Sequence, residues 1–541
     1  MTTATLALMW LAGCAGRQIP EPVYDGPPRR FAVVSINDVY RINGLSVADQ
    51  GGLARVRTLR AELEAEGWEV LMLHGGDVLS PSLLGRAFDG AQMVDVLGGL
   101  DGDFERFDQK MFVTMGNHEF DLDADALDAR MEESAFRWLR TNVRFSKDES
   151  GAPLIDAGSM ITSAMVEVGG AQVGVFGVTT AVKQPDYIAS IREDYESVAR
   201  FRVGALRRAG ADVVIGVTHL DMAQDVALVK ALGDESPELI VGGHDHMKMR
   251  EDINGRVVIK ADADAVTASV IKVTLGADGS VALAPEWVTL DADGPARDPE
   301  VQARVDEWEQ RFEVEYCPSV EAAAGCLDEA LGSTGVELVL VEAEVRRYET
   351  NSGSFVADAA LASFNGEDGP GADIAFINSG SLRMGEDIPA DTALTRRHIE
   401  ELMPYPSPLK VVAIDGATLQ AIVDHSVEDW TGSGHWLQVA GFGFVHDPEA
   451  GTATQLSLFT EDGPRLIAPD ETIRAVTGNY LLEPKWGDQD GYSMLSQELV
   501  VAEGLDLKAV LVDAFSAEIA PVVEGRICNT QREGPCLIPG E

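Results

Sequence analysis

The sequence predicts a layered α/β protein of two domains, and three observations support this fold class. The chain has 541 residues, which is enough for two or more domains. In its first half, short apolar runs typical of buried strands alternate with helical patterns, and this alternation indicates a layered sheet. A second set of strand-like runs follows residue 336.

Each expected element follows from its local pattern. The apolar runs of the first domain lie at residues 31–36, 70–73, 111–115, 173–178, 213–217, 239–241 and 257–259, and those of the second at 374–377, 410–414 and 473–476. Residues 122–140 have the spacing of an acidic helix, and residues 298–312 predict one charged helix with Pro299 near its start. The chain therefore divides into a leader and tether (1–30), a first domain (31–295), a linker helix and cysteine segment (296–335) and a second domain (336–541).

The composition limits the partners of the protein. With 45% hydrophobic residues the chain can bury large cores, while its net charge is −47. An acidic surface of this kind repels nucleic acid and anionic lipid headgroups, so no nucleic-acid partner is expected and a nucleic-acid phosphodiesterase is disfavoured. An anionic ligand would need a locally positive site, supplied by metal ions and a few arginines.

The N-terminus has the features of an export signal. Residues 3–12 form an apolar run that is too short to span a membrane, and the segment ends in Leu11-Ala12-Gly13-Cys14. This tetrapeptide resembles the lipobox of bacterial lipoproteins, in which cleavage precedes the cysteine and lipid is attached to its thiol. We expect an exported protein anchored to the outer membrane only through lipid on Cys14, on the periplasmic side or the surface. A fortuitous cysteine in an apolar leader is the alternative.

Four further cysteines suggest disulfides, because an exported chain with an even number of thiols usually pairs them. They are Cys317, Cys326, Cys528 and Cys536. Four cysteines allow three pairings, and pairing of sequence neighbours is the first expectation, since each pair would close a short loop containing Pro or Gly. A structural zinc site is the less favoured alternative, because no histidine lies near either pair.

Polar side chains follow five of the expected strands in the first domain. These strand ends carry Asn37-Asp38, Gly76-Asp77, Gly116-Asn117-His118, Thr218-His219 and Gly243-His244-Asp245-His246. A lone Asp after a strand is usually a helix cap, but ligands collect at the carboxyl ends of strands in open α/β sheets. Five such ends in one domain therefore indicate a dimetal site, in which a bridging carboxylate, expected to be Asp77, joins two cations about 3.5–4 Å apart.

These motifs, in this order, resemble the calcineurin-like metallophosphoesterases, and most closely the 5'-nucleotidase/UDP-sugar hydrolase family. The resemblance covers nearly the whole chain after residue 30. It implies an N-terminal layered β-sandwich flanked by helices, joined by a helix to a C-terminal α+β substrate-binding domain. It also implies two divalent metal ions, which would be Zn, Mn, Co or Mg. The implied ligands are Asp38, Asp77 and His246 for one ion, and Asp77, Asn117, His219 and His244 for the other.

Two further residues match the catalytic pair of this family. In that pair the imidazole, here His118, stabilises charge on the scissile phosphate, and the carboxylate, here Asp121, orients the ring. A helix N-cap is the alternative role for Asp121. For His246, a supporting position behind the metal ligands is the alternative.

The chain departs from the family at the first motif. The family usually has Asp-x-His there, whereas this chain has Asp38-Val39-Tyr40. Tyr40 either packs and leaves that metal site one ligand short, or coordinates as a phenolate, which would favour a ferric ion.

The second domain contains stretches that resemble the substrate-binding domain of the family. The implied binding residues are Arg346, Asn378, Arg383, Tyr405, Tyr480 and Asp490. The two tyrosines would stack on a base, worth about 1–3 kcal/mol, and the two arginines would bind an anionic group. Asn378 would bond the base, and Asp490 the ribose hydroxyls. Each role has an alternative. The two tyrosines could be ordinary half-buried residues, and Arg346 could form an ion pair with Glu349. Asp488 could take the place of Asp490 at the ribose.

The resemblance implies hydrolysis of nucleotides or related small phosphoesters to a nucleoside and phosphate. Nucleotide sugars, cyclic nucleotides and other phosphoesters are the alternative substrates. The alternative from another class is a catalytically weak nucleotide-binding lipoprotein that lost turnover with the change at Tyr40.

Overall fold

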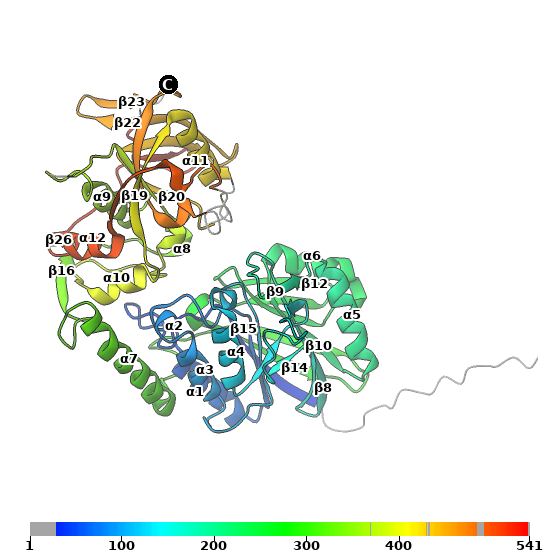
Figure 1. Ribbon diagram of the computed structural model, residues 1–541. Helices are drawn as coiled ribbons and strands as arrows, with labels where there is room; N and C mark the ends of the chain where they lie inside the picture. Colours follow the sequence, from blue (N-terminus) through cyan, green and yellow to red (C-terminus); the bar gives the residue numbers. More distant parts are fainter. Residues whose placement is uncertain (1–28, 368, 429, 431–432, 484–491, 539–541) are drawn as a thin grey trace, which may run out of the picture.

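The computed structural model describes residues 29–367, 369–428, 430, 433–483 and 492–538. It contains two domains, joined by the long helix α7 (Pro299–Ser319), as Figure 1 shows. The predicted fold class is confirmed, whereas the domain limits given above stay a prediction. Cys14, Asp488 and Asp490 lie outside the described residues. Within the described part of the chain, no helix combines the length and the apolar character needed to cross a bilayer.

The first domain is built on two sheets that pack face to face. The seven-stranded sheet has the order β15-β14-β1-β2-β3-β4-β6, with bounds β1 (Arg29–Ile36), β2 (Val70–His74), β3 (Met111–Thr114), β4 (Arg137–Leu139), β6 (Met160–Ile161), β14 (Thr267–Leu275) and β15 (Val281–Thr289). The six-stranded sheet has the order β12-β13-β11-β10-β8-β7, with bounds β7 (Ala164–Val168), β8 (Ala171–Thr179), β10 (Val213–His219), β11 (Leu239–Gly243), β12 (Met249–Ile253) and β13 (Arg256–Lys260). A small pair, β5 (Val143–Phe145) and β9 (Ile188–Ile191), lies beside them.

The apolar runs are continuous because the central strands are buried on both faces. In β1, Phe31 and Val33 belong to the core between the two sheets. Val34 and Ile36 belong to the core under the helices of the outer face. Alternate residues of β1 therefore pack into two different hydrophobic cores. For this reason polar and apolar residues do not alternate along the strand.

Helices cover the outer face of each sheet (Figure 1). The seven-stranded sheet is covered by α1 (Leu53–Ala65), α3 (Ala91–Gly98), α4 (Ala124–Glu133) and part of α7, with the short α2 (Leu83–Ala87) nearby. The six-stranded sheet is covered by α5 (Tyr195–Arg208) and α6 (Met222–Leu232). The single helix expected over residues 122–140 is wrong in its second half. Ser134 ends α4, and the fully buried Phe136 and Trp138 lead into strand β4, which pairs with β3.

The linker helix is longer than expected and packs on the first domain. Asp298 caps its N-terminus by accepting hydrogen bonds from the backbone N–H groups of Glu300 and Val301 at 3.0 Å, and Pro299 occupies the first turn. Val305 enters the core of the first domain, and Phe312 packs near Phe88 and Leu327. A bond from Cys317 to Cys326 closes the segment behind the helix.

The second domain has its own layers. Its five-stranded sheet, β20-β17-β24-β19-β25, has bounds β17 (Ile374–Asn378), β19 (Pro408–Asp415), β20 (Leu437–Ala440), β24 (Thr472–Gly478) and β25 (Val500–Asp506). Smaller sheets are formed by β16 (Ala330–Thr334), β18 (Ala393–Thr395) and β26 (Glu518–Ile519), and by β21 (Phe442–Asp447), β22 (Thr452–Thr460), β23 (Gly463–Leu466) and β27 (Ile527–Asn529). The helices are α8 (Glu342–Val345), α9 (Asn351–Ala362), α10 (Arg396–Leu402), α11 (Gly416–Glu428) and α12 (Leu507–Ala514).

Both disulfides join sequence neighbours, as expected. The second links Cys528 to Cys536 near the C-terminus. Since all four thiols are paired in this way, the alternative of a structural zinc site at these cysteines is wrong.

The packing of α7 gives a stability prediction. Phe312 is 6% exposed, so Phe312→Ala should lower the free energy of unfolding by about 3–5 kcal/mol through a cavity between α7 and the first domain. Val314 on the same helix is 66% exposed, and Val314→Ala is the matched control, expected to change stability by less than about 0.5 kcal/mol. Calorimetric unfolding measures both. Equal, small effects would contradict the docking of α7.

Candidate metal centre

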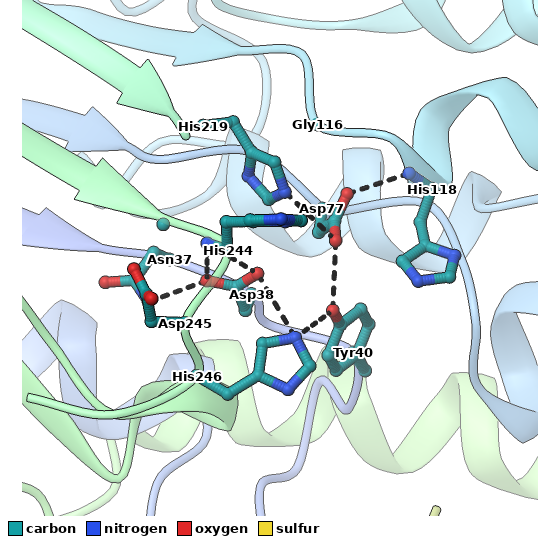
Figure 2. A network of polar contacts seen from close by, with 12 residues as sticks. Asn37, Asp38, Tyr40, Asp77, Gly116, His118, His219, His244, Asp245 and His246 are labelled. Atoms are coloured by element: carbon teal, nitrogen blue, oxygen red, sulfur yellow. Dashed lines mark hydrogen bonds and ion pairs between the residues drawn. The ribbon is translucent and has the colours of Figure 1, made fainter. Parts of the chain in front are cut away.

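The strand ends of the two sheets converge at one edge of the sandwich (Figure 2). Asp38 follows β1, Asp77 follows β2 and Asn117 follows β3, while His219 ends β10 and His244 follows β11. The first three strands are parallel neighbours in one sheet, and the last two in the other. Their carboxyl ends therefore present all these side chains to the same space.

Asp38, Asp77 and His246 form the first cluster. One ligand atom from each lies within 4.8 Å of the others. His246 Nε2 lies 3.5 Å from Asp38 Oδ1. Tyr40 is part of this cluster, because its hydroxyl donates to Asp77 Oδ2 at 3.1 Å and lies 2.9 Å from His246 Nε2.

Asp77, Asn117 and His219 form the second cluster, and His244 lies beside it, with its Nε2 3.7 Å from Asp221 Oδ1. His219 Nε2 lies 3.3 Å from Asp77 Oδ2 and 3.2 Å from Asn117 Oδ1, and the rings of His219 and His244 are 5.0 Å apart. His219 Nδ1 lies 2.8 Å from the carbonyl oxygen of Gly75, which can only accept a hydrogen bond. Nδ1 therefore carries a proton, and Nε2 is the nitrogen available to a cation.

The electrostatics of both clusters suit cations. Asp38 and Asp77 are at most 1% exposed, and among the described residues only histidines form ion pairs with them. Burial would lower the pKa of His219, but Asp77 and Asp38 raise it to about 9, so a cation that binds Nε2 takes the place of a proton. Burial, together with His219, lowers the pKa of His244 to about 3, so that ring is neutral and able to bind a metal. Buried carboxylates with nitrogen and amide-oxygen donors around them match the ligands of divalent ions.

The backbone at this edge is strained. Asp38, Asp77, His244 and His246 all have positive φ, between 51° and 84°. Such conformations cost about 1–3 kcal/mol each in non-glycine residues and gather at functional sites. Gly116 lies so close to Asp77 that a Cβ there would collide with Asp77 Oδ1, which explains the glycine at this turn.

The expected catalytic pair lies beside these clusters. His118 Nδ1 lies 2.9 Å from Asp121 Oδ2, and the backbone N–H of His118 donates to Asp77 Oδ1 at 2.8 Å. The ring of His118 lies 6.0 Å from that of Tyr40. The N-cap alternative for Asp121 is wrong, because Asp123 caps α4.

Several residues that support the site were missed from the sequence. Glu119 is fully buried and accepts the backbone N–H groups of Asp77, Val78, Leu79 and Gly116. Its place next to His118 was the only signal that could have found it. Ser80 and Lys183 contact the carboxylate of Asp121, and no local pattern marks them because their contacts depend on packing. Tyr405, expected as a substrate residue, contacts the same carboxylate.

The second domain meets the metal centre directly. Glu342 accepts a hydrogen bond from His246 Nδ1 at 2.7 Å, and Tyr405 donates to Asp121 at 3.0 Å. Arg41 of the first domain donates to the carbonyl oxygens of Arg383 and Met384 at 2.8 and 2.6 Å. A cavity of about 620 Å³ lies between the domains and is lined by residues that include Tyr40, His246 and Arg383.

The expected substrate residues fall into two groups. The first group lies at the metal centre: Tyr405 contacts Asp121, and Arg383 lines the cavity together with Tyr40 and His246. Asn378 is 5% exposed and accepts from Ser381 at 2.8 Å, and Tyr480 is 39% exposed in the short helix Asn479–Leu482.

The ion-pair partner of Arg346 differs from the Glu349 named above as the alternative. Arg346 pairs with Glu342 at 2.6 Å and not with Glu349. Glu349 instead accepts hydrogen bonds from the backbone N–H groups of Glu524 and Ile527 at 2.9 Å, so its carboxylate fixes the C-terminal part of the second domain.

The tight turn at Gly116 gives a prediction for metal content. Gly116→Ala should push Asp77 out of its position between the two clusters and weaken metal binding about 10–100-fold. Metal analysis after dialysis measures this. Gly158→Ala is the control, because a Cβ there meets nothing within 4 Å. Native metal content in Gly116→Ala would contradict the central position of Asp77.

Comparisons with known proteins agree with this geometry. Residues 31–248 match the model of the calcineurin-like phosphoesterase family, and residues 331–497 match that of the 5'-nucleotidase C-terminal domain. The 5'-nucleotidase of Homo sapiens is 22% identical over 525 residues, which cover 88% of this chain and 85% of the relative. The trifunctional nucleotide phosphoesterase protein YfkN of Bacillus subtilis is 23% identical over 94% of this chain, which spans only 35% of YfkN.

Solved structures show the same fold. The 5'-nucleotidase precursor from Thermus thermophilus superimposes with a TM-score of 0.77 at 22% identity, covering 93% of this chain and all of that one. Both family models and the two-domain fold lead to one conclusion. The chain belongs to the 5'-nucleotidase family, with a calcineurin-like phosphoesterase domain followed by a 5'-nucleotidase C-terminal domain.

Proposed function

We propose that this protein hydrolyses the phosphoester bond of nucleotides and releases a nucleoside and phosphate. The observation that carries the proposal is the convergence of two donor clusters on Asp77, next to the pair formed by His118 and Asp121. Asp38, Asp77 and His246 would hold one cation, and Asp77, Asn117, His219 and His244 the other. Bound cations would supply Lewis acidity and an activated water to the reaction.

His118 and Asp121 have separate roles in this proposal. Asp121 accepts a hydrogen bond from Nδ1 of His118 and so fixes the ring. The imidazolium form of this ring would donate its second N–H, at Nε2, to a phosphoryl oxygen. Burial opposes the charge on Asp121, but His118 and Lys183 hold the pKa of this carboxyl well below its usual range. Asp121 therefore stays ionised, and its contacts with Ser80 and Tyr405 keep it in place.

The cavity between the domains is the proposed entrance for the substrate. Its volume of about 620 Å³ lies within the usual range for small-molecule sites. Arg383 and Arg346 would neutralise an anionic group in this acidic protein, and Tyr405 and Tyr480 would hold the base, with Asn378 and Asp490 bonding base and ribose. The chemistry of a buried arginine fork suits phosphate or carboxylate equally.

We also propose that the protein is exported and anchored through lipid on Cys14. Two disulfides support an oxidising compartment, since paired cysteines rarely persist in the cytosol.

Activity on AMP tests the proposed function. With Mn²⁺, Zn²⁺ or Co²⁺ the protein should release phosphate from AMP, and a chelator should abolish this release. His118→Ala should lower kcat about 10²–10⁴-fold, with little change in KM. His425→Ala, in α11 of the second domain, is the control and should keep native rates. AMP binding without turnover under every metal would favour the nucleotide-binding lipoprotein.

We propose that Tyr40 is a ligand of the metal ion in the first cluster and so influences which metal binds there. Its hydroxyl lies within the first cluster, at hydrogen-bond distance from both Asp77 and His246. A phenolate is a hard, anionic oxygen ligand, and a strongly polarising cation holds such a ligand best. That preference favours ferric iron at this position and a divalent ion at the other.

Absorption spectroscopy tests the role of Tyr40. Purified protein should contain iron and show a visible phenolate-to-iron charge-transfer band that disappears in Tyr40→Phe. Tyr187→Phe is the control, because Tyr187 bonds the carbonyl of Leu122 and should leave the band intact. Iron-free native protein without the band would show that Tyr40 only packs.

A further inference from the structure

The two metal clusters differ in how their histidines are supported. A metal-binding imidazole normally donates its second ring N–H to an acceptor that fixes the ring and raises its basicity. For His219 that acceptor is the carbonyl oxygen of Gly75, which belongs to the same domain. For His246 it is the carboxylate of Glu342, which belongs to the second domain.

The geometry at His246 is that of a supported ligand. Nε2 faces Asp38 at 3.5 Å, inside the first cluster, and Nδ1 faces Glu342 Oε2 at 2.7 Å. Glu342 Oε1 also forms an ion pair with the guanidinium of Arg346 at 2.6 Å. Glu342 is therefore an ionised acceptor, which is the strongest partner for an imidazole N–H.

Contacts within the second domain hold this carboxylate in place for His246. Glu342 is the first residue of α8, and the backbone N–H groups of Leu340 and Val341 donate to Asp387 at 2.7 and 3.1 Å. The other carboxylate oxygen of Glu342 bonds Arg346 at 2.6 Å. Both restraints come from the second domain, so the carboxylate moves with that domain and not with His246.

We propose that Glu342 is a positioning residue that links metal affinity at the first cluster to the arrangement of the two domains. This inference rests on the proposed dimetal site. When the second domain is in the observed position, Glu342 supports His246 and the cation binds tightly; when the domain moves away, that support is lost. Because coupling between two equilibria is reciprocal, the bound cation favours the observed domain position by the same factor.

The proposal also assigns a consequence to Arg346. Arg346 already binds the second carboxylate oxygen of Glu342. An anionic group of the substrate that binds Arg346 would therefore contact the same side chain. Substrate binding and support of His246 therefore involve one connected set of charges, Arg346, Glu342 and His246. The domain contact thus serves metal retention as well as substrate enclosure.

Metal titration of the full chain tests the inference without relying on activity. Chelator-treated native protein should bind two Mn²⁺ by calorimetry. Glu342→Ala should still bind two, with one dissociation constant raised about 10–100-fold, and Glu342→Gln, which keeps an acceptor oxygen, should recover part of the loss. Glu344→Ala is the matched control, because Glu344 lies on the same helix but pairs with Arg532 at 2.7 Å.

Solution scattering adds a readout of domain position. Mn²⁺ should shift native protein toward the compact arrangement and should shift Glu342→Ala less. Equal Mn²⁺ affinity in Glu342→Ala and Glu344→Ala would overturn the inference, and would leave the proposed function intact if the native protein binds two ions and hydrolyses AMP. Native protein that binds no Mn²⁺ would instead overturn the proposed dimetal site itself.

Discussion

The buried negative charge of Asp77 is the constraint on which the site depends. Its carboxylate is 1% exposed and contacts His118, His219 and Tyr40, each from a different strand end. A buried carboxylate next to a second one, Asp38, is costly unless cations compensate it. The strained backbone at the strand ends and the collision that any Cβ at Gly116 would cause are the structural consequences of holding these groups together.

The domain arrangement extends this constraint beyond the first domain. Tyr405 contacts the carboxylate that orients His118, and Glu342 contacts the imidazole of His246. The second domain therefore touches both the catalytic pair and the first cluster. The packing of α7 on the first domain leaves the segment after residue 319, closed by the bond from Cys317 to Cys326, as the connection between the domains.

Local patterns in the sequence were enough to predict the strands that end at the metal centre and the polar residues at their ends. An apolar run followed by Gly and a donor residue specifies both the strand and the turn, so Asp77 and Asn117 could be found without tertiary information. The single helix expected over residues 122–140 was wrong because the spacing of its apolar residues stays helical past Ser134, although the buried Trp138 lies in a strand. Glu342 and Lys183 could not be predicted, because their contacts join residues 96 and 62 positions apart and depend on packing alone.

Anomalous diffraction from crystals grown with Mn²⁺ tests the central claim most directly. The account predicts two peaks about 3.5–4 Å apart, one on each side of Asp77. The first should contact Asp38 and His246, and the second should contact Asn117 and His219. A single peak, or two peaks that do not share Asp77, would contradict it.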